Sequence, residues 1–175
     1  MFKLKKALVV TGSVVAAGLL IGTAAYAIVV GRHGTISEHQ HFVHSTDEFT
    51  TTATSFTNVT GAARWVTIHP GTRRMLDARF TAESACFGAG GWCSVRIVVI
   101  NPAGGVVTEL DPASGFDFAF DSAGGGDRWE AHAMERTSPF LSAGTYRVRV
   151  QARVVAGATR IRLDDWTLAV EVIRP

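Results

Sequence analysis

A two-residue alternation of apolar and polar side chains is the feature that most constrains the fold, and it recurs in five stretches after residue 48. An alternation with this period places one face of a strand in a core and the other in water, which is typical of antiparallel sheets. The apolar members are Leu76, Ala78 and Phe80; Val95, Ile97 and Val99; Phe116, Phe118 and Phe120; Val148, Val150, Ala152 and Val154; and Trp166, Leu168, Val170 and Val172.

Glycine- and proline-containing turn signals separate these stretches, at residues 69–71, 101–105, 123–127, 143–144 and 156–157. Short strands at such regular spacing favour two packed sheets over a single open one. We therefore expect an all-β domain over residues 48–175, an antiparallel β-sandwich of eight to ten strands. A jelly roll is the architecture that this pattern favours.

The first 30 residues carry a targeting pattern. Lys3, Lys5 and Lys6 precede an uncharged run over residues 7–30, and residues 25–27 fit the small-x-small cleavage rule. The run is also long enough to cross a bilayer, which takes roughly 20 residues. We expect a hydrophobic helix that is either a cleaved signal peptide or an uncleaved membrane anchor. Either alternative exports the domain, which is then secreted or tethered to the outer face of the cell membrane.

The net charge of the domain excludes a basic nucleic-acid-binding surface as its main feature. All three lysines lie in the first six residues, and without them 14 arginines face 15 carboxylates. No nucleic-acid partner is expected from this balance.

Residues 31–47 are polar, aperiodic and rich in histidine, so we expect a flexible linker. The alternative is a metal site that gathers His39, His41 and His44.

The chain has two cysteines, Cys86 and Cys93, and they flank a glycine-rich loop. In an exported chain such a pair is more often oxidised than free. Two thiols are too few for a zinc site, and the spacing is not that of a C-x-x-C redox pair. The sequence therefore predicts a disulfide that staples a loop between two strands and contributes at most about 2–3 kcal/mol.

Four segments resemble small exported β-sandwich proteins of high-GC Gram-positive bacteria, a group without an assigned activity. They are ARFTAESACFGAGGWCSVRIVV, FDFAFDSAGGGDRWEAHAMERT, LSAGTYRVRVQ and RIRLDDWTLAVE. The third also resembles TNF/C1q-like jelly rolls, which tend to form trimers. These likenesses imply the fold and a homo-oligomer, and they imply no catalytic activity.

Sequence motifs for catalysis are missing from the chain. It has no G-x-S-x-G, no H-E-x-x-H and no phosphate-binding glycine loop followed by lysine. His132 is the one domain histidine placed to meet a carboxylate, Asp164 or Asp165, and a surface histidine is the commoner explanation. We expect that the protein is not an enzyme, and a secreted hydrolase is the alternative.

Three aspartates form the one candidate metal site inside the domain, and no other cofactor is expected. Asp117, Asp121 and Asp127 lie close together in a loop, and calcium takes such oxygen ligands. Their spacing is not that of an EF-hand, and aspartate is also an ordinary turn residue.

Aromatic side chains are the remaining candidates for binding. The alternation directs Trp65 outward, places Trp129 and Trp166 in the core, and leaves Phe87 and Trp92 inside the stapled loop. Such aromatics either bind a ligand or plug the end of the sandwich. We expect an extracellular, non-enzymatic module that binds carbohydrate or protein at Trp65, Phe87 and Trp92. The alternative is a structural jelly-roll homo-oligomer.

Overall fold

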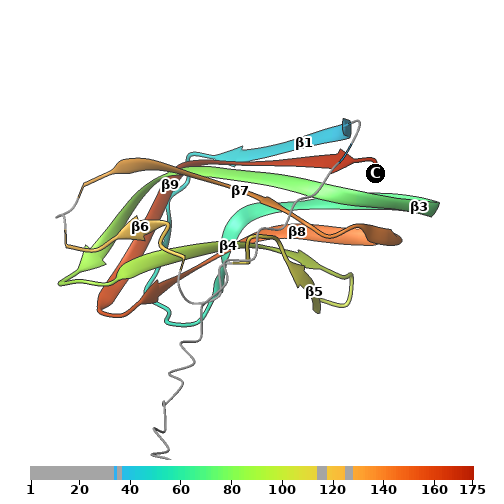
Figure 1. The fold of residues 1–175 in the computed structure, drawn as a ribbon. Coiled ribbons are helices and arrows are strands. Elements are labelled where there is room, and N and C mark those ends of the chain that lie inside the picture. The colour runs from blue at the N-terminus through green and yellow to red at the C-terminus, as the bar shows by residue number, and fades with distance from the viewer. Residues whose placement is uncertain (1–33, 35–36, 114–117, 125–127) are drawn as a thin grey trace, which may run out of the picture. The chain divides into compact units, whose positions relative to one another are not determined.

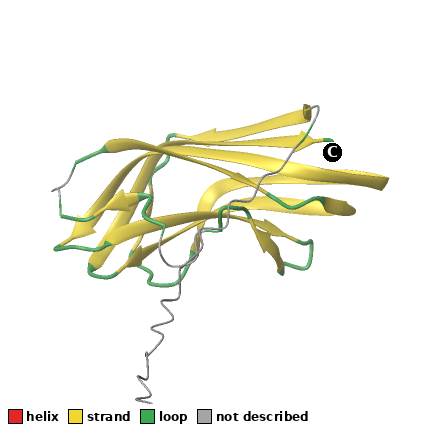
Figure 2. Ribbon diagram, in the orientation of Figure 1, coloured by secondary structure: helices red, strands yellow, loops and turns green. Residues whose placement is uncertain are grey.

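The computed structural model describes residue 34 and residues 37–113, 118–124 and 128–175. These residues form strands and loops, with no helix among them (Figure 2), and every strand pairing is antiparallel. The strands are β1 (Ser37–Ser45), β2 (Phe49–Thr51), β3 (Thr57–Gly88), β4 (Trp92–Ile100), β5 (Val106–Glu109), β6 (Asp121–Ser122), β7 (Glu130–Thr137), β8 (Leu141–Val155) and β9 (Ala158–Ile173). The predicted all-β antiparallel fold is confirmed.

Two sheets face each other as a β-sandwich (Figure 1). Sheet A contains β1 and β2 on one side of β9, followed by the second part of β3 and then β7. Sheet B contains the first part of β3, followed by β8 and β4, with β5 and β6 along β4. The strand β3 therefore belongs to both layers.

Two predicted turns lie inside long strands instead. Residues 69–71 belong to β3, where the register against β8 shifts between Ile68 and Arg73. Residues 143–144 belong to β8. A bulge absorbs the extra residues on one strand and bends it, so β3 turns from sheet B into sheet A without leaving the ladder. The turn predictions are confirmed at residues 101–105, which join β4 to β5, and at residues 156–157, which join β8 to β9.

The core lies between the two sheets and is lined by the alternating residues. The predicted inward members on β3, β4, β8 and β9 are all buried. Phe120 is also buried, but residues 118–120 form no strand, and Phe116 lies outside the described residues. The backbone of this segment reaches the start of β4 where the Phe120 N–H donates to the carbonyl oxygen of Cys93 at 2.9 Å, and the pairing continues in β6.

The prediction of a flexible linker is wrong for residues 37–45, which form β1. This strand pairs with β9 from Ser45 opposite Trp166 to Ser37 opposite Ile173. Its polar sequence lacks the apolar alternation that would predict a buried strand. It is ordered because the free edge of β9 supplies its backbone hydrogen bonds. An ion pair secures its beginning, because Glu38 bonds to both Arg74 and Arg174.

Residues 1–30, with their predicted hydrophobic helix, lie outside the described residues. In the part of the chain that is described, no helix has the length and apolarity needed to cross a membrane.

Candidate functional site

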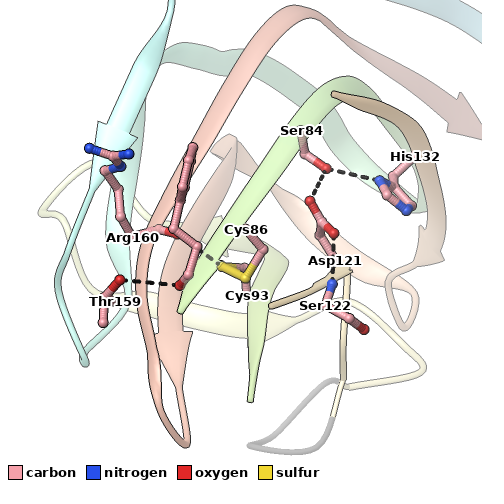
Figure 3. The surroundings of a disulfide bond; sticks show 9 residues. Ser84, Cys86, Cys93, Asp121, Ser122, His132, Thr159 and Arg160 are labelled. Atoms are coloured by element: carbon pink, nitrogen blue, oxygen red, sulfur yellow. Dashed lines mark hydrogen bonds between the residues drawn. A yellow bond between two sulfur atoms is a disulfide. The ribbon is translucent and has the colours of Figure 1, made fainter. Parts of the chain in front are cut away.

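The predicted disulfide is present and joins the two sheets. Cys86 and Cys93 are bonded with their Cα atoms 5.8 Å apart, and both side chains are buried in the core. Cys86 pairs with Ile161 in sheet A, whereas Cys93 pairs with Val154 in sheet B. The bond therefore fastens one end of the sandwich, rather than only closing a surface loop (Figure 3).

The stapled loop is a tight connection from β3 in sheet A to β4 in sheet B, and its glycines meet a neighbouring turn. A Cβ on Gly88 would lie 2.5 Å from the carbonyl oxygen of Gly157, and one on Gly91 would lie 2.2 Å from that of Ala156. No side chain fits at such distances, so the glycine content serves the close approach of two backbones.

Phe87 and Trp92 are both half-buried, and neither is an open binding platform. The guanidinium carbon of Arg160 lies 3.9 Å from the centroid of the Phe87 ring and covers one of its faces. The indole Nε1 of Trp92 is buried and has no hydrogen-bond partner among the described residues. This geometry favours the plugging alternative for the loop.

A polar cluster that the sequence did not predict lies next to the disulfide, and Figure 3 shows its three members together. The Ser84 hydroxyl donates to Asp121 Oδ2 at 2.8 Å and lies 2.8 Å from His132 Nδ1. The backbone N–H of Ser122 donates to the second carboxylate oxygen, Oδ1, at 2.7 Å. Three elements supply this cluster: β3, β6 and β7.

An open cavity of about 450 Å³ exposes part of this cluster to solvent. Asp121, Glu130, His132 and Arg128 line it, with the disulfide at Cys86 forming part of its wall. His132 Nε2 lies 3.8 Å from Glu130 Oε2. The prediction that His132 meets Asp164 or Asp165 is therefore wrong, because Ser84 and Glu130 are its partners. The spacing of Glu130 and His132, two residues apart on one strand, does place them on one face, and this was the available sequence signal.

The Ser84 cluster is not a nucleophilic triad, although it holds the same residue types. In a triad the carboxylate orients the histidine, which accepts the serine proton. Here the hydroxyl donates to the carboxylate, and Ser84 is completely buried. It therefore has no path to a substrate carbonyl.

The predicted calcium ligands are described only in part. Asp117 and Asp127 lie outside the described residues, while Asp121 joins Glu130 and His132. Donor atoms of these three residues lie within 4.8 Å of one another.

Trp65 points outward, as the alternation predicts, and is 47% exposed. It lies on the outer face of sheet B, opposite Arg147 of β8, whose guanidinium carbon is 5.5 Å from the ring centroid. Arg149 and Arg153 follow on the same face, because they alternate with buried Val148, Val150 and Ala152.

Of the other two tryptophans, one follows its prediction. Trp166 is buried against Phe80, with ring centroids 6.4 Å apart. The prediction that Trp129 lies in the core is wrong: it is 39% exposed and lies beside Arg162, because the face of β7 whose parity it shares, that of Ala131 and Ala133, is the exposed one.

The three histidines of β1 do not gather on one face. His39 and His41 share a face, with ring centroids 6.4 Å apart, whereas the alternation of the strand directs His44 to the other. Burial lowers the pKa of His41, and the positive charge of Arg64 lowers it further.

Comparison with known proteins gives no family for this chain. No family model matches it, and no curated protein matches it. Among solved structures it is similar to one titled "Structure of infectious bursal disease virus Gx strain", with a TM-score of 0.47 and 12% sequence identity. The match covers 84% of this chain, which spans only 36% of the length of the other.

Proposed function

We propose that this protein is an exported, non-enzymatic β-sandwich module that binds an acidic carbohydrate through the outer face of sheet B. The observation that supports this proposal is the exposed ring of Trp65 beside three arginines on one face of β8. These arginines, called the arginine row below, are Arg147, Arg149 and Arg153. The disulfide supports the exported location, because such bonds are typical of oxidising compartments.

The arginine row carries positive charge that its own face balances only in part. Arg96 of β4 pairs with Glu109 at 3.1 Å. Within the described chain, no carboxylate lies within ion-pair distance of Arg147 or Arg149. Burial lowers the pKa of Arg149, and the nearby charge of Arg147 lowers it further. A carboxylate from a ligand would relieve this repulsion and accept two parallel hydrogen bonds from a guanidinium.

The aromatic rings on this face favour a sugar as the bearer of that carboxylate. Aromatic rings pack against the apolar face of a ring-shaped ligand, and Trp65 is available beside the cations. At the other end of the row, Phe56 lies between Arg96 and Arg153, whose guanidinium carbons are 4.0 and 4.7 Å from its centroid. These stacks hold Arg96 and the buried Arg153 in place and fix the end of the face next to the ligand-accessible Arg147 and Arg149.

Binding of polygalacturonate to the full-length chain tests the proposal, with the fully methyl-esterified polymer as the uncharged control. We expect Trp65→Ala and Arg149→Gln each to weaken binding of the acidic polymer about tenfold or more. The matched controls are Trp129→Ala, another exposed tryptophan beside an arginine, and Arg79→Gln on sheet A; both should bind as the wild type does.

Three outcomes would contradict the proposal. Equal binding of the methyl ester would remove the role of charge, and equal losses in both tryptophan variants would remove the role of Trp65. Equally tight binding of duplex DNA would indicate simple ion exchange on a cationic face.

A structural homo-oligomer is the second candidate, and Phe42 favours it. This side chain is 60% exposed on β1, which ends the strand order of the sandwich. A jelly-roll trimer that buries Phe42 would show a threefold mass in light scattering, and Phe42→Ser would return it to the monomer mass.

A further inference from the structure

We propose a binding site for a divalent transition-metal ion of the Zn²⁺ type at Asp121, Glu130 and His132. This site lies at the disulfide end of the sandwich and is separate from the face of Trp65. It differs in its ligands from the calcium site expected from Asp117, Asp121 and Asp127.

The three donor groups converge on one wall of the cavity described above. Their ligand atoms lie within 4.8 Å of one another, whereas two ligands of a tetrahedral Zn²⁺ lie about 3.3 Å apart. Glu130 can close this difference by a change of rotamer, since its side chain is 62% exposed. Asp121 and His132 come from β6 and β7, whose backbones the sheets hold in place.

The hydrogen bonds of Ser84 leave the correct nitrogen of His132 free for a metal. A hydroxyl has one proton, and Ser84 uses it in the hydrogen bond that it donates to Asp121 Oδ2, because a carboxylate oxygen can only accept. In the hydrogen bond between Ser84 and His132, the donor must then be Nδ1–H of the imidazole and the acceptor Oγ of the serine. The neutral imidazole therefore carries its lone pair on Nε2, the atom that faces Glu130 across the cavity.

This arrangement is the one that metal-binding histidines usually have. A ligating histidine donates its other ring N–H to a fixed oxygen, which sets the ring orientation. Ser84 supplies that oxygen and at the same time orients Asp121, so one buried hydroxyl positions two ligands. Each Asp121 oxygen accepts one described hydrogen bond and keeps a second lone pair for a metal.

The donor set favours Zn²⁺ over Ca²⁺. An imidazole and two carboxylates suit zinc and related ions, while calcium takes six to eight oxygen ligands. Three protein ligands leave a coordination position open toward the cavity. Arg128 lines the same cavity, so an anion that completes the coordination would also meet a cation.

The test is calorimetric titration of the untagged, full-length chain with Zn²⁺ and, separately, with Ca²⁺. We expect one equivalent of Zn²⁺ to bind, and His132→Asn and Glu130→Gln each to weaken its binding at least tenfold. Ser84→Ala keeps all three ligands but loses their orientation, so it should weaken binding about 10- to 100-fold. Cobalt substitution should give the visible absorption of a low-coordinate site in the wild type and lose it in His132→Asn.

Matched controls separate this site from other metal-binding groups. Glu135→Gln lies on the same strand but the opposite face, and it should bind Zn²⁺ as the wild type does. The same is expected of the double variant His39→Asn, His41→Asn. Circular dichroism checks the fold of each variant, and Glu130→Gln keeps the test decisive because its exposed side chain contributes little to packing.

The proposal is overturned if the wild type binds no Zn²⁺, or if binding survives in Glu130→Gln and His132→Asn. Loss of binding in the β1 histidine variant would assign the metal to that strand instead. Ca²⁺ binding as tight as that of Zn²⁺ would show that the ion is held by oxygen ligands and that the site has no preference for a transition metal.

Discussion

At the scale of single residues, Gly91 shows how closely the stapled loop approaches the turn between β8 and β9. A methyl group at this position would lie 2.2 Å from the carbonyl oxygen of Ala156 and 2.3 Å from that of Val155. Gly104 has a similar backbone angle, φ 89° against 82°, but has nothing within 4 Å of its Cβ position. Alanine substitutions at Gly91 and Gly104 therefore separate two costs to stability, that of a positive φ and that of the close approach between two backbones.

We expect Gly104→Ala to lower the free energy of unfolding by about 1 kcal/mol, the usual cost of a positive φ without glycine. Gly91→Ala pays the same cost and also forces two backbones apart, so we expect a loss of about 3 kcal/mol or more. Urea denaturation of both variants measures the difference. Equal losses would mean that the stapled loop moves away from the turn freely and that its glycines give flexibility, as a binding loop would need.

The residue scale also shows where alternation succeeds as a predictor. Trp65 and Trp166 lie inside strands, and both have the orientation that their parity predicts. Trp129 shares the parity of Ala131 and Ala133, and that face of β7 is exposed. Parity alone does not say which of the two faces is buried, and small alanines do not mark a core face.

At the scale of elements, β1 is the strand whose existence is hardest to infer. His41, Val43 and Ser45 are partly buried opposite buried residues of β9, whereas His39, which lies opposite Val172, is exposed. A stretch with this composition has little apolar area to bury, and its ordering depends on the edge of β9 and on the arginines that bind Glu38.

Amide hydrogen exchange tests the element directly. We expect the amides of residues 37–45 that bond to β9 to be protected, although less than those of central β9, because an edge strand opens at lower cost. Glu38→Gln should reduce this protection along β1 and leave the protection of β4 unchanged. Exchange of these amides at the rate of an unstructured peptide would instead support the prediction that residues 37–45 belong to a flexible linker.

At the scale of the whole molecule, ionisable groups make stability depend on pH, and two kinds of group act in opposite directions. Burial, together with the charges of Glu135 and Glu171, raises the pKa of Asp77 to about 6. Bonds to arginine lower the pKa of Glu38 and of Glu48 to about 2. The two glutamates add stability above pH 4.5 that is lost as the pH falls toward 2, whereas the stability associated with Asp77 is lost as the pH rises from 3.8 to 6.

Asp77→Asn should therefore stabilise the protein at pH 7 and have little effect below pH 4, where the aspartic acid is already neutral in the folded state. We expect a gain of about 1 kcal/mol at pH 7, after allowance for solvent screening of a half-buried group. Thermal unfolding at the two pH values measures it. A gain of the same size at both would show that packing, rather than the carboxylate charge, explains the effect.

Much of the fold follows from the sequence by itself, because its signals are local. Alternation within β8 and β9 predicts which side chains face the core, whatever strand lies beside them, whereas in β4 the alternate residues Ser94 and Val98 are buried as well. The two cysteines lie seven residues apart and are the only two in the sequence, so they specify their own disulfide. Neither inference needs to know which strands pair.

Only the tertiary structure decided the pairings between distant segments, and with them the candidate sites. Ser84, Asp121 and His132 meet because β3, β6 and β7 end at the same place, and separations of 37 and 48 residues carry no periodic signal. The residues of β1 became a strand because β9 had an unpaired edge for them. Hydrogen bonds across a sheet depend on the register of another segment, and that register is a property of the folded chain alone.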